Sequence, residues 1–317
     1  MALLIGTDEA GYGPNLGPLV ISATVWECNG DWQSLDLEHA LQKLTGDGDP
    51  RYRLAIADSK QVFSPAGGFR QLERTLFTFL ALQRAQPTNW QGIWSHLAPS
   101  SVEQFTQLPW YNGFDVRVPV DLELNELHPL VENAGLFFAD APVRFCKAAS
   151  RSVEPPLFNE LSDQLGNKAS LLTDVTLKLV EQVLGQYPPQ PALVLCDKHG
   201  GRNRYLAALQ TVFPEHLIRV ISESGPISVY RSGTQEAPIE FRFVAKGERL
   251  FPVALASMFS KYLRELGMLA FNEFWARHEP GLKPTAGYPL DAKRFRIDIS
   301  PAAKRLAIGA EVFWRTR

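Results

Sequence analysis

Cysteine is scarce in this sequence of 317 residues: the chain has three, Cys28, Cys146 and Cys196, far apart from one another. Three scattered thiols support neither a disulfide framework nor a clustered zinc site, and a reducing, cytoplasmic location is therefore expected. A long apolar run is also missing at the N-terminus, because Asp8 and Glu9 interrupt the first one. Such a start is typical of neither a signal peptide nor a membrane span, so we expect no membrane partner.

Repeats, low-complexity tracts and Ser/Gly-rich linkers are absent, and so is the phosphate-binding pattern G-x-x-x-x-G-K-[ST]. Hydrophobic residues make up 45% of the chain and charged residues 21%, which excludes a disordered chain and allows a sizeable core. We therefore expect a single domain over residues 1–317. Residues 86–135 are a candidate insertion, and residues from about 266 to 317 form an expected C-terminal extension.

Excess positive charge is missing as well, since the formal net charge is −2, which argues against a nucleic-acid partner. The two halves of the chain differ, however. Residues 1–158 carry 11 Lys and Arg against 18 Asp and Glu, a net of −7, whereas residues 159–317 carry 21 against 16, a net of +5. This asymmetry indicates an anionic partner, although unevenly spread solvated charge explains it equally well.

Apolar spacing predicts an α/β protein. Strands are predicted at residues 2–7, 19–26, 53–57, 136–149, 192–196, 217–221, 227–231 and 239–245, and helices at 67–84, 170–184 and from 251 to about 274. The short turn between the first two strands implies an antiparallel pair. Strands followed by alternating helices and strands predict a mixed sheet. The basic segment 293–296 is interpreted as a surface strand.

Acidic residues follow two of the predicted strands. Asp8 and Glu9 come directly after the first strand, and Asp197 ends the apolar run at 192–196. Ligand chemistry in α/β proteins gathers at such strand ends. Adjacent strand residues point to opposite faces, so Asp8 and Glu9 share a site only if the strand bends or ends, which Gly11 and Gly13 permit. Capping of the turn by these carboxylates is the alternative.

A fourth carboxylate, Glu265, lies on the last predicted helix at four-residue spacing from Lys261 and Ser257. An ordinary Lys–Glu pair on a helix surface explains this spacing as well. Acidic groups from two strands and a helix are nevertheless a set that holds Mg²⁺ or Mn²⁺, because these hard cations prefer carboxylate oxygen and water.

In chain order, several segments resemble type 2 ribonuclease H, the ribonuclease HII/HIII family. The matching segments are Gly6-Thr7-Asp8-Glu9-Ala10-Gly11-Tyr12-Gly13-Pro14 with Gly17-Pro18, Asp58-Ser59-Lys60, Asp197 at a strand end, Lys246-Gly247-Glu248, Ala256-Ser257-Met258-Phe259-Ser260-Lys261-Tyr262-Leu263-Arg264-Glu265, and Ala286-Gly287-Tyr288. They span nearly the whole chain, whereas residues 86–135 match none of the family's motifs.

The resemblance implies a ribonuclease H-like fold, with a mixed five-stranded sheet flanked by helices and a C-terminal helical extension. It implies that Asp8, Glu9, Asp197 and Glu265 form the catalytic metal site, with two Mg²⁺ or Mn²⁺ ions bound during catalysis. The implied reaction is hydrolysis of RNA in an RNA–DNA hybrid, or of ribonucleotides embedded in duplex DNA, giving 5′-phosphate and 3′-hydroxyl ends. Recognition of the ribose 2′-hydroxyl would distinguish RNA from DNA.

Substrate contacts are expected at the turn of the first motif and at basic residues beside the motifs. The candidates are Gly11, Tyr12, Gly13, Lys60, Lys198, Arg202, Lys246, Lys261 and Tyr288. The basic loop after Asp197 is equally consistent with a solvated turn. His199 in that loop is a candidate for proton transfer to the leaving group, because the ordinary pKa of histidine lies near neutrality.

Two positions differ from the HII branch of the family. Tyr12 stands where that branch has Arg or Lys, and Glu265 stands where it has Asp, as in the HIII branch. An alternative function is therefore a hybrid-binding module on the same fold with weakened catalysis. A second alternative is a DNA-cutting nuclease of the same fold, against which the pairing of the first motif and the helix motif argues.

Overall fold

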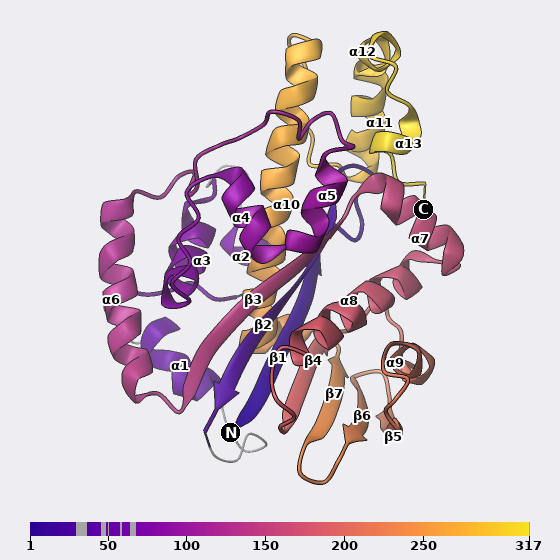
Figure 1. The fold of residues 1–317 in the computed structure, drawn as a ribbon. Coiled ribbons are helices and arrows are strands. Elements are labelled where there is room, and N and C mark those ends of the chain that lie inside the picture. The colour runs from indigo at the N-terminus through magenta and orange to yellow at the C-terminus, as the bar shows by residue number, and fades with distance from the viewer. Residues whose placement is uncertain (30–36, 46–48, 50, 58, 64–67, 317) are drawn as a thin grey trace.

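The protein is described by a computed structural model covering residues 1–29, 37–45, 49, 51–57, 59–63 and 68–316. Asp58 of the D-S-K segment lies outside the described residues, and so does the side chain of Lys60. The chain forms one large mixed sheet with helices on both faces (Figure 1). The predicted α/β class is therefore confirmed.

The sheet has seven strands in the order β3-β2-β1-β4-β7-β6-β5, so the expectation of five strands was wrong. The strands are β1 (Ala2–Ala10), β2 (Leu19–Cys28), β3 (Val143–Val153), β4 (Ala192–Asp197), β5 (Arg219–Glu223), β6 (Ile227–Gly233) and β7 (Pro238–Val244). β1, β4 and β7 run parallel to one another, and the outer strands pair antiparallel to their neighbours. The predicted antiparallel pairing of the first two strands is confirmed. The two additional strands are β5 and β6, which are antiparallel to each other and extend the sheet beyond β7.

The helical segments follow in chain order. They are α1 (Leu37–Thr45), α2 (Ser59–Val62), α3 (Arg70–Leu82), α4 (Trp90–Leu97), η1 (Pro99–Ser101), α5 (Val102–Phe105), α6 (Leu124–Asp140), α7 (Pro155–Gln164), α8 (Lys168–Leu184), α9 (Leu206–Val212), η2 (Gly247–Arg249), α10 (Phe251–His278), α11 (Pro289–Asp298), α12 (Ser300–Arg305) and α13 (Ala310–Phe313). No described helix is both long and apolar enough to span a bilayer.

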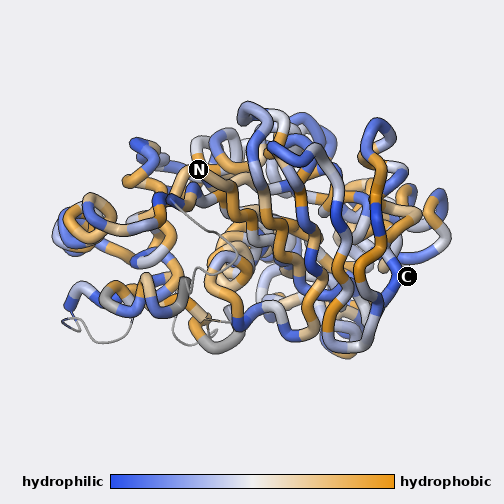
Figure 2. Tube along the Cα trace, turned by 90° about the horizontal axis from the view of Figure 1, so that it is seen from below, coloured by the Kyte–Doolittle hydropathy of each residue, from blue (hydrophilic) through white to orange (hydrophobic). Residues whose placement is uncertain are grey.

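The strands separate two hydrophobic cores because alternate side chains of a strand point to opposite faces. On β1, Leu4 belongs to the core that contains α3, α4 and α10, whereas Leu3 and Ile5 belong to the core that contains α8 and α9. On β4, Leu195 faces the first core and Val194 the second. Hydrophobic residues accordingly concentrate along the central strands (Figure 2).

Helix α10 lies very close to β1 and β2. A Cβ atom on Gly6 would lie 2.3 Å from the carbonyl carbon of Pro252, so only glycine fits at this point of β1. Thr24 of β2 donates a hydrogen bond of 2.8 Å to the Pro252 carbonyl, and Ser260 donates one of 2.9 Å to the Asp8 carbonyl. These contacts place the middle of α10 beside the end of β1.

Three predicted elements were wrong. Residues 53–57 form no strand, and residues 136–140 are the last turn of α6, so that the following strand begins at Val143. Residues 293–296 belong to helix α11 rather than to a surface strand. Residues 53–57 are irregular, and in the other two cases a short apolar or basic run fits a strand and a helix equally well.

The segment 86–135 packs into the first core. Its aromatic residues Trp90, Trp94 and Trp110 are buried, and the Trp110 ring contacts Phe271 of α10 edge to face at 5.1 Å. Tyr111 of the same segment donates a hydrogen bond of 3.2 Å to Glu154, at the start of α7.

Glu154 is a buried carboxyl group, only 2% exposed. Its Oε1 accepts hydrogen bonds from Ser152 and Tyr111, whereas its Oε2 has no partner among the described residues. Burial raises the pKa of Glu154 from 4.5 to about 7, despite the opposing effects of these bonds and of the Arg315 charge. Since the pKa in the folded protein exceeds that of the unfolded chain, this group favours folding most at low pH, and the benefit is lost between pH 4.5 and about 7.

Replacing Glu154 with glutamine is therefore expected to stabilise the protein, relative to wild type, increasingly as the pH rises. Between pH 4.5 and 8 the difference in the free energy of unfolding should change by about 3 kcal/mol, because the variant carries no charge to bury. Urea unfolding at several pH values measures it. Glu160→Gln, at an exposed site on the same helix, is the control and should show a pH-independent difference. An equally flat profile for Glu154→Gln would contradict the assignment.

Candidate active site

Two carboxylates meet where the parallel strands β1 and β4 end their pairing. The last paired residues are Thr7 of β1 and Cys196 of β4, so Asp8 and Asp197 are the next residues on the two strands. Asp8 is four residues after Leu4, and Asp197 is two residues after Leu195, so each aspartate lies on the same face of its strand as that leucine. This is the face covered by α10, because Leu4 and Leu195 belong to the core that contains α10. Pairing of the strands therefore brings together two acidic residues far apart in the sequence.

Asp8 lies in an environment that disfavours its charge. Burial raises its pKa to about 7, and the negative charges of Asp197 and Glu248 add to the effect. A hydrogen bond with Ser257 of α10 acts in the opposite direction. The Asp8 carboxyl group therefore lies between a serine of α10 and the carboxylates of two other segments.

Glu9 joins the same cluster although its strand position faces the opposite side of the sheet from that of Asp8. Its pKa lies well above the ordinary value because of burial and of the charges of Asp8 and Asp197, and a hydrogen bond between the Asp8 and Glu9 carboxyl groups adds to the increase. Strand β1 ends one residue later, at Ala10. The end of the strand thus lets both neighbours reach one site, as the glycines after it suggested.

Sequence reasoning gave no role to Glu248, whose charge acts on Asp8. The turn before it is tight: Lys246 has a positive φ of 59°, and the Gly247 N–H donates a hydrogen bond of 2.7 Å to Asp197 Oδ1. A Cβ on Gly247 would lie 3.0 Å from the Asp197 Cα. The K-G-E motif pointed to this segment, but only the fold shows that its glutamate faces the cluster.

Glu265 is held by cations of its own helix. Its Oε1 accepts from Lys261 Nζ at 2.7 Å and from Arg264 Nη1 at 3.0 Å. The guanidinium of Arg264 is buried and also donates to the Ala286 carbonyl at 2.8 Å. The Lys–Glu pair expected from the four-residue spacing is therefore present, and an arginine that the spacing did not indicate reinforces it.

The cluster formed by Asp8, Glu9 and Asp197 suits a divalent cation. Its carboxyl groups are partly buried, and the neighbouring negative charges raise the pKa values of Asp8 and Glu9. Neutralisation by a hard cation relieves this repulsion. Within the described residues, no three acidic, histidine or cysteine side chains already have the geometry of a metal site. Carboxylate oxygens are the donors that Mg²⁺ and Mn²⁺ prefer, so the residue types fit these cations. The side chains would have to move before they could coordinate a cation together.

The glycine turn follows β1 directly. Gly11 has a φ of 91°, and a Cβ there would lie 2.5 Å from the Pro18 carbonyl oxygen and 2.6 Å from Arg264 Nε. Lys168 Nζ lies over the Tyr12 ring, 4.8 Å from the ring centre. Burial, and to a smaller extent the Glu9 charge, raises the pKa of the Tyr12 hydroxyl. Gly13 is exposed, and a Cβ there would meet nothing within 4 Å. The turn is thus fixed at Gly11 and open at Gly13.

The basic loop after Asp197 is largely tied to the protein. Lys198 Nζ donates to Asn203 at 2.6 Å and also to the Ser224 carbonyl, and Arg202 Nη2 donates to Ser170 of α8 at 2.7 Å. His199 is 2% exposed, and burial lowers its pKa to about 3. Its ring therefore stays neutral, beneath the loop.

The other predicted contact residues lie around the cluster. Lys246 is exposed at the turn beside Asp197, and Tyr288 is 53% exposed at the start of α11. The Gly287 carbonyl, next to Tyr288, accepts hydrogen bonds from Asn15 and Leu16 of the glycine turn. Tyr288 is therefore an exposed aromatic residue adjoining that turn.

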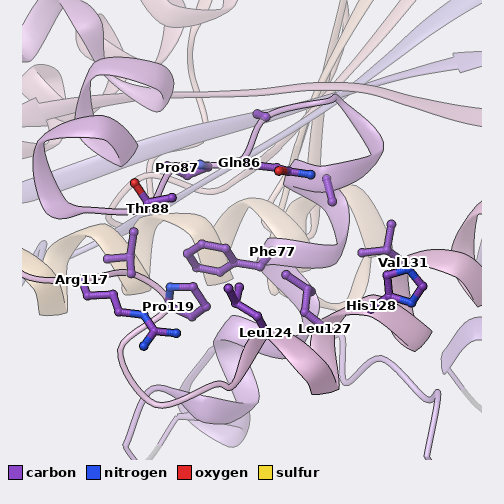
Figure 3. A pocket seen from close by; sticks show the side chains of 13 residues that line it. Phe77, Gln86, Pro87, Thr88, Arg117, Pro119, Leu124, Leu127, His128 and Val131 are labelled. Carbon is purple, nitrogen blue, oxygen red and sulfur yellow. The ribbon is translucent and has the colours of Figure 1, made fainter.

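An apolar cavity of about 390 Å³ lies apart from this chemistry, between α3, α6 and the chain around residues 85–88 and 117–119 (Figure 3). Phe77, Pro119, Leu124 and Leu127 line it, and none of its lining residues is acidic. The cavity therefore offers no carboxylate ligand for a cation.

Comparison with known proteins gives likenesses in structure alone. No protein-family model and no curated protein matches the sequence. The chain is similar to the ribonuclease H2 of Pyrococcus horikoshii OT3, with a TM-score of 0.49 and 14% identity over 98% of this chain and 92% of that one. The RNase HII of Archaeoglobus fulgidus, solved as a complex with PCNA, gives 0.45 and 13% over 99% and 94%.

Bst-RNase HIII, solved in complex with Mn²⁺, gives a TM-score of 0.39 and 16% identity over 99% of this chain and 66% of that one. The structural neighbours are thus archaeal RNase HII and bacterial RNase HIII chains. At these identities and scores the likeness supports neither a substrate nor a chemistry.

The two glycines of the turn are expected to respond differently to alanine. Gly11→Ala should lower the free energy of unfolding by at least about 2 kcal/mol, because its Cβ overlaps backbone at a positive φ. Gly13→Ala, the matched control two residues away, should change it by no more than about 0.5 kcal/mol. Urea denaturation measures both values. Equal stabilities of the two variants would show that Gly11 is not confined as described.

Proposed function

We propose that this protein is a divalent-metal-dependent endoribonuclease that hydrolyses RNA in RNA–DNA hybrids, or ribonucleotides embedded in duplex DNA. The observation that supports it most is the convergence of Asp8, Glu9 and Asp197 at the ends of two parallel strands, beside a glycine turn that is exposed at Gly13. Clustered, partly buried acidic groups are costly to maintain for structure alone, so they indicate a site that binds positive charge.

Asp8, Glu9 and Asp197 would hold the cations, and Glu265 is proposed as the fourth ligand. For this, Glu265 must release at least one of its bonds to Lys261 and Arg264. The chemistry that two Mg²⁺ or Mn²⁺ ions supply, when bound, is activation of the attacking water and neutralisation of charge on the leaving 3′-oxygen.

The remaining residues bind and orient the duplex. The exposed backbone around Gly13 is proposed to contact the ribose 2′-hydroxyl, which only RNA carries. Tyr288 offers an exposed ring beside the same turn, and Lys246 an exposed ammonium group beside Asp197. Lys198 and Arg202 support the substrate surface through their bonds within the protein. His199, buried and neutral, is assigned to packing beneath the loop rather than to proton transfer.

A second candidate function is binding of the hybrid without turnover. The ion pairing of Glu265 with Lys261 and Arg264 favours it, because a carboxylate satisfied in this way is a poorer cation ligand. Measuring binding and cleavage separately distinguishes the two candidates.

Asp8→Asn is expected to abolish cleavage while leaving the fold intact, because the amide keeps the shape of the carboxyl group but loses the charge that attracts a cation. The loss should exceed about 100-fold, corresponding to a few kcal/mol of transition-state stabilisation. Three labelled duplexes are incubated with Mg²⁺ or Mn²⁺: a full RNA–DNA hybrid, DNA with one ribonucleotide, and DNA alone. Asp140→Asn, at an exposed residue ending α6, is the control and should retain full activity.

Each outcome of this assay separates the candidates. Metal-dependent cleavage at ribonucleotides supports the proposal, and full activity of Asp8→Asn would show that the metal site is misassigned. Binding of the hybrid without cleavage by the wild-type protein would favour the binding module. Cleavage of the all-DNA duplex would favour a DNA nuclease.

Glu265→Gln tests the fourth ligand. We expect kcat to fall at least about tenfold with little change in the affinity for the hybrid, since the carboxylate acts on the cations rather than on the duplex. Glu273→Gln is the matched control, because Glu273 forms an exposed pair with Arg277 on the same helix. An unchanged kcat in Glu265→Gln would show that Glu265 is not the fourth cation ligand. Glu248 would then be the next carboxylate to test.

A further inference from the structure

Arg315, close to the C-terminus, is buried completely against the glycine turn. Its Nη1 donates to the carbonyls of Gly11 and Pro14, and its Nη2 donates to the carbonyl of Gly17. The guanidinium also lies over the Phe158 ring, with 4.6 Å between its central carbon and the ring centre. One side chain therefore contacts the beginning, middle and end of the turn.

A buried guanidinium is costly unless its donors are satisfied. Carbonyls of the turn accept the hydrogen bonds of the two terminal nitrogens of Arg315, whereas its Nε has no partner among the described residues. The Glu154 carboxyl group acts on Arg315 through its charge. Burial, together with the charge of Arg264, lowers the pKa of Arg315 to about 9, which still leaves it charged at neutral pH. The three accepting carbonyls are directed inward as a consequence.

The chain around Arg315 is itself attached on two sides. The Arg315 N–H donates to the Asn15 carbonyl at 2.9 Å, and Asn15 Nδ2 donates to the Arg315 carbonyl at 3.1 Å. Leu16 and Trp314 form an antiparallel bridge. On the other side, Asn159 of α7 donates to the Trp314 carbonyl at 2.9 Å. The C-terminal segment thus links helix α7 to the turn.

The turn needs such support because its backbone has little regular structure of its own. Gly11 and Gly17 have φ values of 91° and 78°, in the left-handed region. The exposed Gly13 lies between them. Glycine residues allow a turn to adopt many conformations, and hydrogen bonds to the carbonyls at both ends of this turn restrict them.

We propose that Arg315 is a positioning residue that holds the Gly11–Gly17 turn in the conformation that recognises the ribose. The inference rests on the proposed function, which assigns that turn to the ribose 2′-hydroxyl. Arg315 touches neither substrate nor cation: it acts through the three carbonyls. Its removal should therefore impair discrimination between RNA and DNA more than it impairs binding to a duplex in general.

Amide hydrogen exchange measures this positioning without any need for activity. In Arg315→Ala, peptides covering the turn should exchange at least tenfold faster, while peptides from β4 and α8 keep their wild-type rates. Arg315→Lys should give an intermediate rate, because one ammonium group cannot reproduce the forked contacts to Gly11 and Gly17. Arg305→Ala is the matched control: it removes an exposed arginine that donates to the His278 carbonyl at 2.7 Å, in the same C-terminal extension.

A variant that acts from a distance covers the case in which Arg315→Ala does not fold. Asn159→Ala loosens the attachment of Trp314 without touching the turn, and it should accelerate exchange of the turn about threefold. Wild-type exchange rates in the turn for every folded variant of Arg315 and Asn159 would overturn the proposal.

Binding measured without divalent cations provides the functional readout. The ratio of the dissociation constants for DNA duplex and RNA–DNA hybrid should fall at least fivefold in Arg315→Lys and stay at the wild-type value in Arg305→Ala. A merely structural role would reduce the fraction of active protein and leave this ratio unchanged, an outcome that would contradict the proposal. If wild-type protein cleaves none of the three duplexes, the proposed function fails, whereas the exchange rates still decide whether Arg315 positions the turn.

Discussion

Parallel hydrogen bonding between β1 and β4 brings Asp8 and Asp197 together, and the remainder of the site depends on this pairing. Both strands are buried on two faces, so their register is strongly specified: a slip by one residue would move Leu4 and Leu195 out of their core. The same constraint fixes the acidic residues that follow. The pairing that stabilises the sheet therefore also holds the carboxylates close enough to repel one another. The close packing of Pro252 on Gly6 brings α10 to the same edge.

Two buried arginines connect this edge to the C-terminal part of the chain. Arg264 joins Glu265 to the Ala286 carbonyl, and its side chain fills the space that a Cβ on Gly11 would need. Arg315 holds the other side of the turn through the Gly11 and Gly17 carbonyls. Because a guanidinium donates in several directions, each arginine satisfies acceptors from segments that share no secondary structure. The turn beside the carboxylates is therefore ordered by residues from the end of the chain.

Sequence patterns predicted the elements with one clear periodicity and missed contacts between distant segments. The strands that carry Asp8 and Asp197 were predicted from unbroken apolar runs, and the helix that carries Glu265 from the proline at its start and its four-residue spacing. The strand count was wrong, since a resemblance does not reveal that residues 219–233 extend the sheet. Neither Glu248 nor Arg315 was singled out: the first depends on a tight turn at Lys246, and the second on acceptors near the opposite end of the chain.

The location of the basic residues changes the meaning of the charge asymmetry. The second half of the chain carries the net positive charge, yet the charged groups of Lys198, Arg202 and Arg315 form hydrogen bonds within the protein. Lys246 and Arg249, on either side of the Gly247 that donates to Asp197, are exposed. Under the proposed function, these internal contacts would lower the electrostatic, nonspecific part of the affinity for a duplex. Under the same proposal, selectivity for RNA would come from the shape of the glycine turn, so the contacts that hold this turn would matter more than the overall charge.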